Sequence, residues 1–530
     1  MNAAENVQEQ AVVGAFPQIS FKKPAGDHWV WLCSGALTVS LLALIGLVLL
    51  IISQGFRALW PAPIHLIQMG DKDAVLGEIV ERDPEHDRIH IRRGNREIFG
   101  LDFTWVNMDE STGREIPKNA LMLERLENGN FYGFLDNSLS EDQFKRAVAQ
   151  GAKGLASLHH MEDALNDYNI KLKKLKSKMF RAADNPDKLA ALAAEKTEIE
   201  ADFQKEIDRV EKFRADLFAE KVALVDVTGR AVSLPAASVL RIVYPNRMNF
   251  FSRCWLFVKR FFALLVDPPR EANTEGGLFP AIFGTALMVL LMSLFATPLG
   301  VIAAVYLHEY AKSGWFVRWV RITVNNLAGV PSIVYGIFGL QFFVYGIGGS
   351  IDQWFFSENL PTPTFGTGGL IWASLTMALL TLPVVIVATE EGLSAVPKGM
   401  REGALALGAS QWQTIWRVVL PMSSPGILTG VILSIARAAG EVAPLMLVGV
   451  IKLAPHLALD GHFPFFHPER KFMHLGFHIY DVGFQSPNVD AAIPMVYVTT
   501  FFLLTLVLGL NALAMILRQK LRQRYRSGAF

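Results

Sequence analysis

Long uncharged apolar runs alternate with charged stretches along this chain. A membrane-spanning helix needs about 20 mostly apolar residues. Runs at or near that length lie at 29–56, 276–307, 322–351, 359–389, 418–436 and 491–517, and the fifth continues past an arginine and a glutamate to Ile451. The pattern predicts six spanning helices. The first run is too long for a signal peptide and lacks a small-residue cleavage site, so we expect a retained anchor.

Between the first two runs lies a charged segment, 57–275, with strand-like ends. Apolar positions alternate near 77–106 and 221–245 and are interrupted by Gly, Asp and Asn, as in turns. The middle has the 3-4 spacing of a coiled coil, seen at Leu158, Met161, Leu165 and Tyr168. We therefore expect a separate α+β domain with a helical hairpin at about 155–221 that turns at Asn185-Pro186. This hairpin could be a docking arm or a spacer and self-association element.

Basic residues in the short loops fix the expected orientation. With a cytoplasmic N-terminus, the inner segments include Lys22, Lys23, Arg401 and the tail "RQKLRQRYR". The expected order is a cytoplasmic tail (1–28), a first span (29–56), a periplasmic domain (57–275), a permease domain (276–517) and a basic cytoplasmic tail (518–530). The segment 250–266 mixes aromatics with arginine and lysine, which favours a helix lying in the membrane interface over a seventh span.

Composition agrees with a membrane protein that has a large water-facing part. The 530 residues are 51% hydrophobic and 19% charged, with a formal net charge of +1. The two cysteines have no metal-ligand spacing and are interpreted as small hydrophobic residues. The basic tail fits attraction to lipid headgroups rather than nucleic-acid binding.

The inner connection 390–421 has the signature of a helix-turn-helix. Pro397 suits a first helical turn, Gly408 supplies a left-handed ending, and Ser410 with Gln413 has capping-box spacing for a second helix that should stop before Pro421. This connection contains Glu-Gly-Ala, then a glycine four positions later, and it closes with Leu-Pro. The pattern resembles the EAA loop of ATP-binding-cassette (ABC) importer permeases. That resemblance assigns ATPase coupling to Arg401, Glu402, Gly403, Ala404, Gly408, Leu420 and Pro421.

Further stretches narrow the resemblance. The segments 276–311, 326–340, 381–421 and 425–445, above all "ARAAGEVAP", are similar to the A-type permease of the bacterial phosphate-specific transport system. This implies a membrane all-α fold: a six-helix type I, MetI-like permease bundle, here with an inserted periplasmic α+β domain. It also implies a multi-pass inner-membrane protein with both termini cytoplasmic. Segment 57–275 departs from the short form of this permease.

The same resemblance implies the partners. They are a homologous C-type permease, two copies of a cytoplasmic ABC ATPase and a periplasmic phosphate-binding protein, all working at a lipid bilayer. The chain has no G-x-x-x-x-G-K-[ST] phosphate loop. We therefore expect a transport subunit that is not an enzyme, binds no cofactor directly, and depends on ATP used by the partner ATPase.

Arg437 and Glu441 are the conspicuous charges of the fifth apolar run. Charges within a membrane helix are costly and usually face a bundle interior or find a partner. Four residues apart, these two can pair on one helix face. They could form a salt bridge between helices, or line the translocation pathway, where the planar guanidinium matches phosphate oxygens. The pathway is the favoured interpretation.

Other interpretations remain open at this point. The substrate could be another oxyanion, such as sulfate or molybdate, because selection rests largely with the binding protein. The chain could also be a membrane-anchored coiled-coil scaffold or signalling protein. Such a protein, however, would have no use for six spanning helices and the loop. The histidines at 456–478 are expected at the surface or interface rather than in a metal site.

Overall fold

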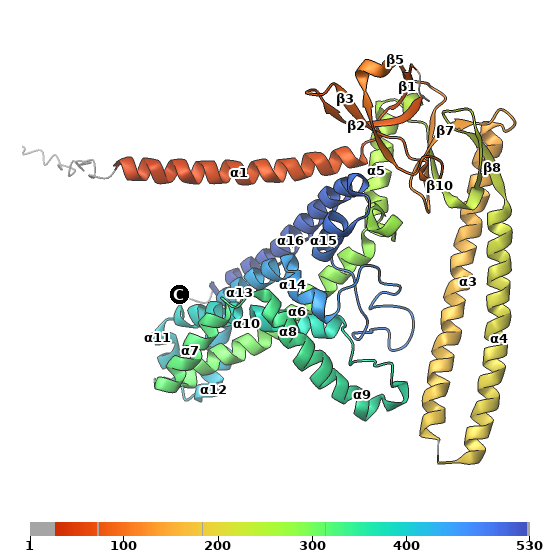
Figure 1. The fold of residues 1–530 in the computed structure, drawn as a ribbon. Coiled ribbons are helices and arrows are strands. Elements are labelled where there is room, and N and C mark those ends of the chain that lie inside the picture. Colours follow the sequence, from red (N-terminus) through yellow and green to blue (C-terminus); the bar gives the residue numbers. More distant parts are fainter. Residues whose placement is uncertain (1–26, 71–73, 183, 313, 527–530) are drawn as a thin grey trace, which may run out of the picture. The chain divides into compact units, whose positions relative to one another are not determined.

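The computed structural model describes residues 27–70, 74–182, 184–312 and 314–526 (Figure 1). Two units divide the chain, residues 1–53 and residues 54–530. The first unit contributes most of helix α1 (Asp27–Leu59), which is apolar along nearly its whole length. The predicted N-terminal tail, up to residue 26, and the last four residues of the basic tail lie outside the described residues.

Six helical segments of the described chain are long and apolar enough to cross a membrane. They are Trp29–Leu59, Phe279–Tyr310, Ser332–Phe355, Leu370–Ser394, Gln411–Gly440 and Val489–Leu521. The third starts ten residues later than the sequence predicts, because Pro331 caps its first helix, α8 (Ser332–Phe338). The preceding residues form a separate amphipathic helix, α7 (Trp315–Leu327). Pro331 therefore begins the third span.

The permease bundle is built from four long helices. They are α6 (Phe279–Val305), α10 (Leu370–Ser394), α13 (Leu420–Gly440) and α16 (Val489–Arg526). Met288 and Met292 of α6 and Met377 of α10 are fully buried in the common core. A Cβ atom at Gly426 would lie 2.6 Å from the Cα atom of Gly392. Glycine at these positions lets α10 and α13 approach closely, as the small residues of α13 suggest.

Shorter helices and turns complete the described part of the bundle. These are α9 (Gly349–Phe355), α11 (Lys398–Ala406), α12 (Gln411–Thr414), α14 (Ala443–Val448), α15 (Leu475–Gln485), a 3-10 turn at Ser357–Asn359, and π-helical segments at Tyr306–Tyr310, Gly339–Gly348 and Ile415–Val419. The helical path from Gln411 to Gly440 is uninterrupted, because α12, the π-helical turn and α13 follow one another directly.

Two antiparallel five-stranded sheets form the inserted domain. The first has the order β4-β3-β2-β1-β5 and the second the order β10-β6-β7-β8-β9. Their strands are β1 (Ile64–Met69), β2 (Val75–Asp83), β3 (Arg88–Arg92), β4 (Phe103–Asn107), β5 (Ser111–Glu115), β6 (Leu121–Arg125), β7 (Phe131–Leu135), β8 (Lys221–Val225), β9 (Ala231–Pro235) and β10 (Val239–Val243). A small ribbon, β11 (Pro269–Arg270) with β12 (Glu275–Gly276), follows. Helix α2 (Arg96–Phe99) and 3-10 turns at Met108–Glu110, Ala236–Ser238, Pro245–Arg247 and Glu271–Asn273 connect these elements.

A long helical hairpin separates the strands of the second sheet in sequence. It consists of α3 (Glu141–Arg181) and α4 (Pro186–Ala219), antiparallel in Figure 1. Leu158 and Leu175 are buried in the seam, and the rings of Tyr168 and Phe203 are 5.9 Å apart. The hairpin starts earlier than the expected residue 155, because Ser140 and Gln143 form a capping box. A capping box satisfies free amides at a helix start and so fixes that start.

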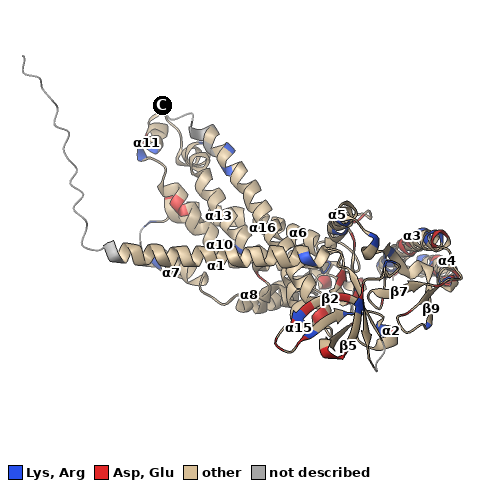
Figure 2. Cartoon of the chain, turned by 90° about the horizontal axis from the view of Figure 1, so that it is seen from above, with Lys and Arg blue, Asp and Glu red and all other residues tan. Residues whose placement is uncertain are grey.

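Helix α5 (Phe250–Val266) carries the aromatic and basic segment that the sequence places in the interface. It is not among the six apolar segments that could span. Phe250, Phe251, Trp255 and Phe262 are exposed, whereas Leu256 and Leu264 are buried. Figure 2 shows that Lys, Arg, Asp and Glu gather on the sheets, α3 and α4, while the bundle helices carry few of them.

Candidate functional site

Arg437 and Glu441 lie together where α13 ends. The Arg437 Nε atom is 3.7 Å from a Glu441 carboxylate oxygen, and the two side chains are 34% and 25% exposed. Both side chains are therefore partly buried. The charged pair that the sequence predicts does form, although its atoms lie beyond hydrogen-bonding distance.

The helix does not continue through the pair, which corrects the expected run to Ile451. Helix α13 stops at Gly440, and Glu441 has extended backbone angles (φ −80°, ψ 134°). A second helix, α14, starts at Ala443 with Pro444 in its first turn. Proline cannot donate a backbone hydrogen bond and is favoured at the first turn of a helix, so the chain restarts there. Glu441 thus lies in a break between helices.

The Arg437 guanidinium is incompletely satisfied. Its Nε atom is removed from solvent and has no hydrogen-bond partner among the residues described. A guanidinium offers several donors in a planar fork, which suits the oxygens of a phosphate or another oxyanion. The pair can therefore exchange a loose internal contact for a tighter contact with an anion.

The loop at 398–421 is a short helix, a tight turn and a second helix. Helix α11 ends at Ala406, and Gly408 two residues later has a left-handed φ of 85°, which is strained for any residue with a Cβ atom. Ser410 and Gln413 form the predicted capping box at the start of α12. The second helix does not stop before Pro421, which corrects that expectation. The π-helical turn Ile415–Val419 precedes the proline, and α13 continues through it.

The outer surface of this loop is apolar and uncovered. Leu407 is 90% exposed, and Met400 and Leu405 are also exposed. The rings of Trp412 and Trp416 stack 5.6 Å apart on the next turns and are exposed as well. Contiguous exposed apolar side chains commonly mark a protein-binding or membrane-binding surface. We call these five residues the loop surface.

The predicted coupling residues divide into three groups in the structure. Glu402, Gly403 and Gly408 are exposed next to the loop surface. Arg401 turns inward instead, and its Nη2 atom lies 3.0 Å from Glu309 and 2.7 Å from the carbonyl oxygen of Leu393. Ala404, Leu420 and Pro421 are half-buried, the last two at the start of α13. The predicted set does not form one cluster.

Glu309 is the residue that sequence reasoning missed. It lies in the π-helical segment that ends the second span, and its carboxylate contacts both Arg401 and His308. The carbonyl oxygen of Glu309 accepts a hydrogen bond from Gln411 at 3.4 Å. Glu309 thus connects the end of the second span with α11 and α12. The only sequence signal is the polar "HEY" directly after an apolar run.

Comparisons with known proteins identify relatives of this chain. Residues 296–527 match the family described as "Binding-protein-dependent transport system inner membrane component". The phosphate transport system permease protein PstA of Haemophilus influenzae is 35% identical over 208 residues, which are 38% of this chain and 67% of that protein. PstA of Mycobacterium leprae is 41% identical over 188 residues, 35% of this chain and 56% of that protein. This chain belongs to the PstA-type permease family.

The match to the family model covers residues 296–527, which belong to the bundle and not to the inserted domain. The chain spans little more than half the length of the PstA of Mycobacterium leprae. Among solved structures, the MetNI methionine ABC transporter is similar at 18% identity and a TM-score of 0.33, over 46% of this chain and 95% of that chain. A TM-score this low carries no structural argument. The family is one of inner-membrane transport subunits, so this PstA-type chain is a multi-pass inner-membrane protein.

Two histidines of this PstA-type chain correct an expectation. His474 and His478 are buried, not at the surface or interface. His474 Nδ1 accepts a hydrogen bond from the backbone of Gly476 at the start of α15, and His478 Nδ1 lies 3.2 Å from the hydroxyl of Thr499. In both imidazoles Nδ1 has a partner, whereas Nε2 is buried without a hydrogen-bond partner among the described residues. Within the described ranges, no three His, Cys, Asp or Glu residues are grouped to hold a metal ion.

Proposed function

We propose that this chain is the transmembrane permease subunit of an ATP-driven importer of inorganic phosphate. The family supports an importer, and its PstA members are named for phosphate transport. The observation that carries the proposal is the Arg437 guanidinium, held loosely by Glu441 at the break between α13 and α14. An arginine that is fully paired would have no donor left for a passing anion.

In this mechanism Glu441 holds Arg437 in reserve. Phosphate that reaches the pathway accepts hydrogen bonds from the guanidinium and displaces the carboxylate, which is free to move because it lies outside the helix. Repulsion between the carboxylate and the anion then favours onward movement instead of tight retention. Arg437 and Glu441 bind and release; neither undergoes covalent chemistry.

The proposal extends to the partners, and the exposed apolar loop surface supports the first of them. An ABC ATPase binds the loop surface together with Glu402, Gly403 and Gly408, and two copies of it serve this chain and a homologous C-type permease. A periplasmic phosphate-binding protein delivers the substrate. The chain itself binds no cofactor, and ATP is hydrolysed by the partner. This arrangement requires a cytoplasmic loop, cytoplasmic termini and a periplasmic inserted domain.

The continuous helix from Gln411 to Gly440 supplies the mechanical connection. At 1.5 Å per residue, Arg437 lies roughly 40 Å along this helical path from Gln411. A movement of α11 is carried by the helix to the charged pair, while Arg401 and Glu309 tie α11 to the second span. Leu420 and Pro421 lie on this path, which gives them a role in transmission rather than in contact with the ATPase.

The experiment is uptake of radioactive phosphate into proteoliposomes that contain the purified complex, its binding protein and internal ATP. Uptake should need ATP and should persist in a large excess of sulfate or molybdate. In a second assay the binding protein is replaced by its sulfate or molybdate counterpart. If sulfate or molybdate then competes with phosphate, the other oxyanion importers are favoured. A complex that inserts correctly but transports none of the three anions would favour the scaffold alternative.

A further inference from the structure

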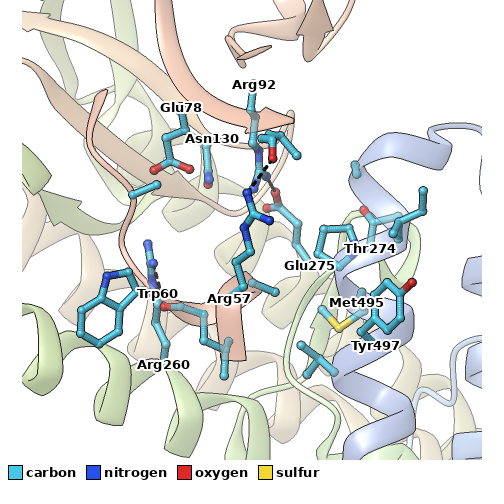
Figure 3. A pocket seen from close by; sticks show the side chains of 18 of the residues that line it. Arg57, Trp60, Glu78, Arg92, Asn130, Arg260, Thr274, Glu275, Met495 and Tyr497 are labelled. Carbon is cyan, nitrogen blue, oxygen red and sulfur yellow. Dashed lines mark hydrogen bonds and ion pairs between the residues drawn. The ribbon is translucent and has the colours of Figure 1, made fainter. Parts of the chain in front are cut away.

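A cavity of about 580 Å³ lies between the inserted domain and the ends of two spanning helices (Figure 3). Its walls come from residues 54–60 at the end of α1, from β2 and β3, from 260–276 and from 490–498 at the start of α16. These segments are far apart in sequence. A volume in this range suits a ligand the size of a lipid headgroup with part of its chains.

The position of the cavity places it at a membrane surface. The rings of Phe56 and Phe501 are 5.5 Å apart, so the end of the first span and the start of the last lie side by side. The ring of Trp60 lies 6.1 Å from Phe257 and 6.2 Å from Phe250 of α5. Aromatic side chains of this kind are enriched at the depth of lipid headgroups. The cavity therefore opens where phospholipid headgroups are found.

One wall of the cavity is apolar and the other is charged. Leu264, Ile493 and Met495 line the apolar wall, contributed by α5 and α16. The charged wall carries nearly equal numbers of arginines and carboxylates. Several of these neutralise one another: Arg92 pairs with Glu275, and Arg241 and Arg260 both pair with Glu124. A ligand for this cavity must be amphiphilic.

Several charged groups of the wall form no ion pair within the described ranges: Arg57 and Arg270 among the cations, and Glu78, Glu81 and Asp267 among the carboxyls. Arg57 extends into the cavity in Figure 3 and donates a hydrogen bond to the carbonyl oxygen of Val80 at 3.1 Å, but within the described ranges it has no carboxylate at ion-pair distance. Glu78 likewise has no such cation partner among the described residues. Burial raises the pKa of the Glu78 carboxyl, although Arg92 and Arg260 oppose the shift. The wall thus offers a charged headgroup both cationic and carboxyl partners, with Arg57 and Glu78 among them.

We propose that this cavity binds a zwitterionic ethanolamine phospholipid. The phosphodiester accepts hydrogen bonds from Arg57, the ammonium group approaches Glu78, and the acyl chains leave along Leu264, Ile493 and Met495. An ammonium ion beside Glu78 restores the ionised carboxylate that burial disfavours. A purely anionic headgroup would leave Glu78 without a partner and face the other carboxylates of the wall. The bound lipid would tie the inserted domain to the membrane, independently of the transported substrate.

Native mass spectrometry of the purified transport complex tests this proposal. The complex is delipidated by detergent exchange and incubated with phosphatidylethanolamine or phosphatidylglycerol of identical acyl chains. We expect one retained phosphatidylethanolamine per chain, and at least tenfold less retained phosphatidylglycerol. Arg57→Gln should reduce retention of phosphatidylethanolamine about tenfold, which corresponds to the loss of one charge-assisted contact. Arg230→Gln is the matched control, because Arg230 is exposed in the turn between β8 and β9.

Three outcomes would overturn the proposal. Equal retention of the two lipids by the unchanged complex would remove the role of Glu78, and this comparison needs no variant to fold. Unchanged retention in Arg57→Gln would remove the role of Arg57. Displacement of the lipid by inorganic phosphate at millimolar concentration would identify free phosphate, not a phospholipid, as the ligand of the cavity.

Discussion

Arg125 in the inserted domain and Arg437 in the bundle are both arginines withdrawn from water, yet their surroundings differ. Arg125 is 3% exposed and pairs with Glu97 at 2.5 Å, while its other donors reach the carbonyl oxygens of Asn128 and Gly129 at 2.7 and 2.8 Å. Arg437 has one carboxylate at 3.7 Å and a buried Nε without a hydrogen bond. The first holds a fold together, and the second retains capacity for a ligand.

Neutralising the pair of Arg437 and Glu441 tests the difference between the two arginines most directly. We predict that Arg437→Gln with Glu441→Gln lowers phosphate uptake roughly 1,000-fold, because two charge-assisted hydrogen bonds to the anion are lost. ATP binding by the assembled complex should not change. The measurement is uptake in proteoliposomes, with the exposed hairpin pair Lys205→Gln and Asp202→Asn as control. Normal uptake by a correctly inserted double variant would exclude the pathway role.

A substitution of Arg125 in the inserted domain tests the arginine that is fully paired. Arg125→Gln should destabilise the domain by about 3 kcal/mol, because it leaves Glu97 and two carbonyl groups without their buried partner. Hydrogen exchange of the β6 and β7 amides in the intact complex measures this loss. Arg230→Gln should stay within about 0.5 kcal/mol of the unchanged chain. If Arg125→Gln exchanged no faster than this control, Arg125 would not be a structural arginine.

A charge reversal at Glu402 on α11 tests a third kind of environment, an exposed charge. Glu402→Lys should reduce recovery of the ATPase with the solubilised permease about tenfold, the effect expected of one disrupted contact at an interface. Glu391→Lys reverses an exposed charge outside α11 and is the control. Equal recovery of the ATPase with both variants would contradict a coupling role for Glu402.

The smallest expected effect concerns a buried histidine of the first sheet. Burial and the nearby charges of Arg114 and Arg82 lower the pKa of His65 from 6.5 to about 4. His65 is therefore neutral in the folded domain and binds a proton more readily when unfolded. Its contribution is present above pH 6.5 and is lost as the pH falls towards 4.

Between pH 7.5 and about 5.8 the amides of β1 and β5 should lose about 1 kcal/mol of protection against exchange. His65→Gln should flatten this dependence, because glutamine does not titrate. An equally steep decline in the variant would assign the pH dependence to other groups.

The features predicted from sequence are those with a local signal. Six apolar segments are recognisable because each is close to the length of a bilayer crossing, and the hairpin turn at Asn185-Pro186 because asparagine caps and proline begins α4. The capping box at Ser410 is a local pattern too. The charged pair of Arg437 and Glu441 was found because charges are rare in apolar runs.

The features that were missed depend on contacts between distant segments. The glycine and the following Pro444 in "ARAAGEVAP" are signals for a helix end, but the alanines and the arginine favour a longer helix, and the longer helix was expected. The contact of Glu309 with Arg401 joins residues of different spans, and Arg57 meets β2 only in the folded domain. The burial of His474 and His478 likewise comes from the packing of α15 and α16.

Because the helix between the loop and the charged pair is unbroken, it also fixes the direction in which Arg437 points relative to the loop. Each residue of an α-helix turns the next side chain by about 100° around the axis. One alanine inserted anywhere between Trp416 and Ile435 would leave both ends chemically intact and yet point Arg437 towards a different neighbour. The number of residues between the two ends is therefore constrained by the angle at which those ends must face, in addition to any packing requirement at single positions such as Gly426.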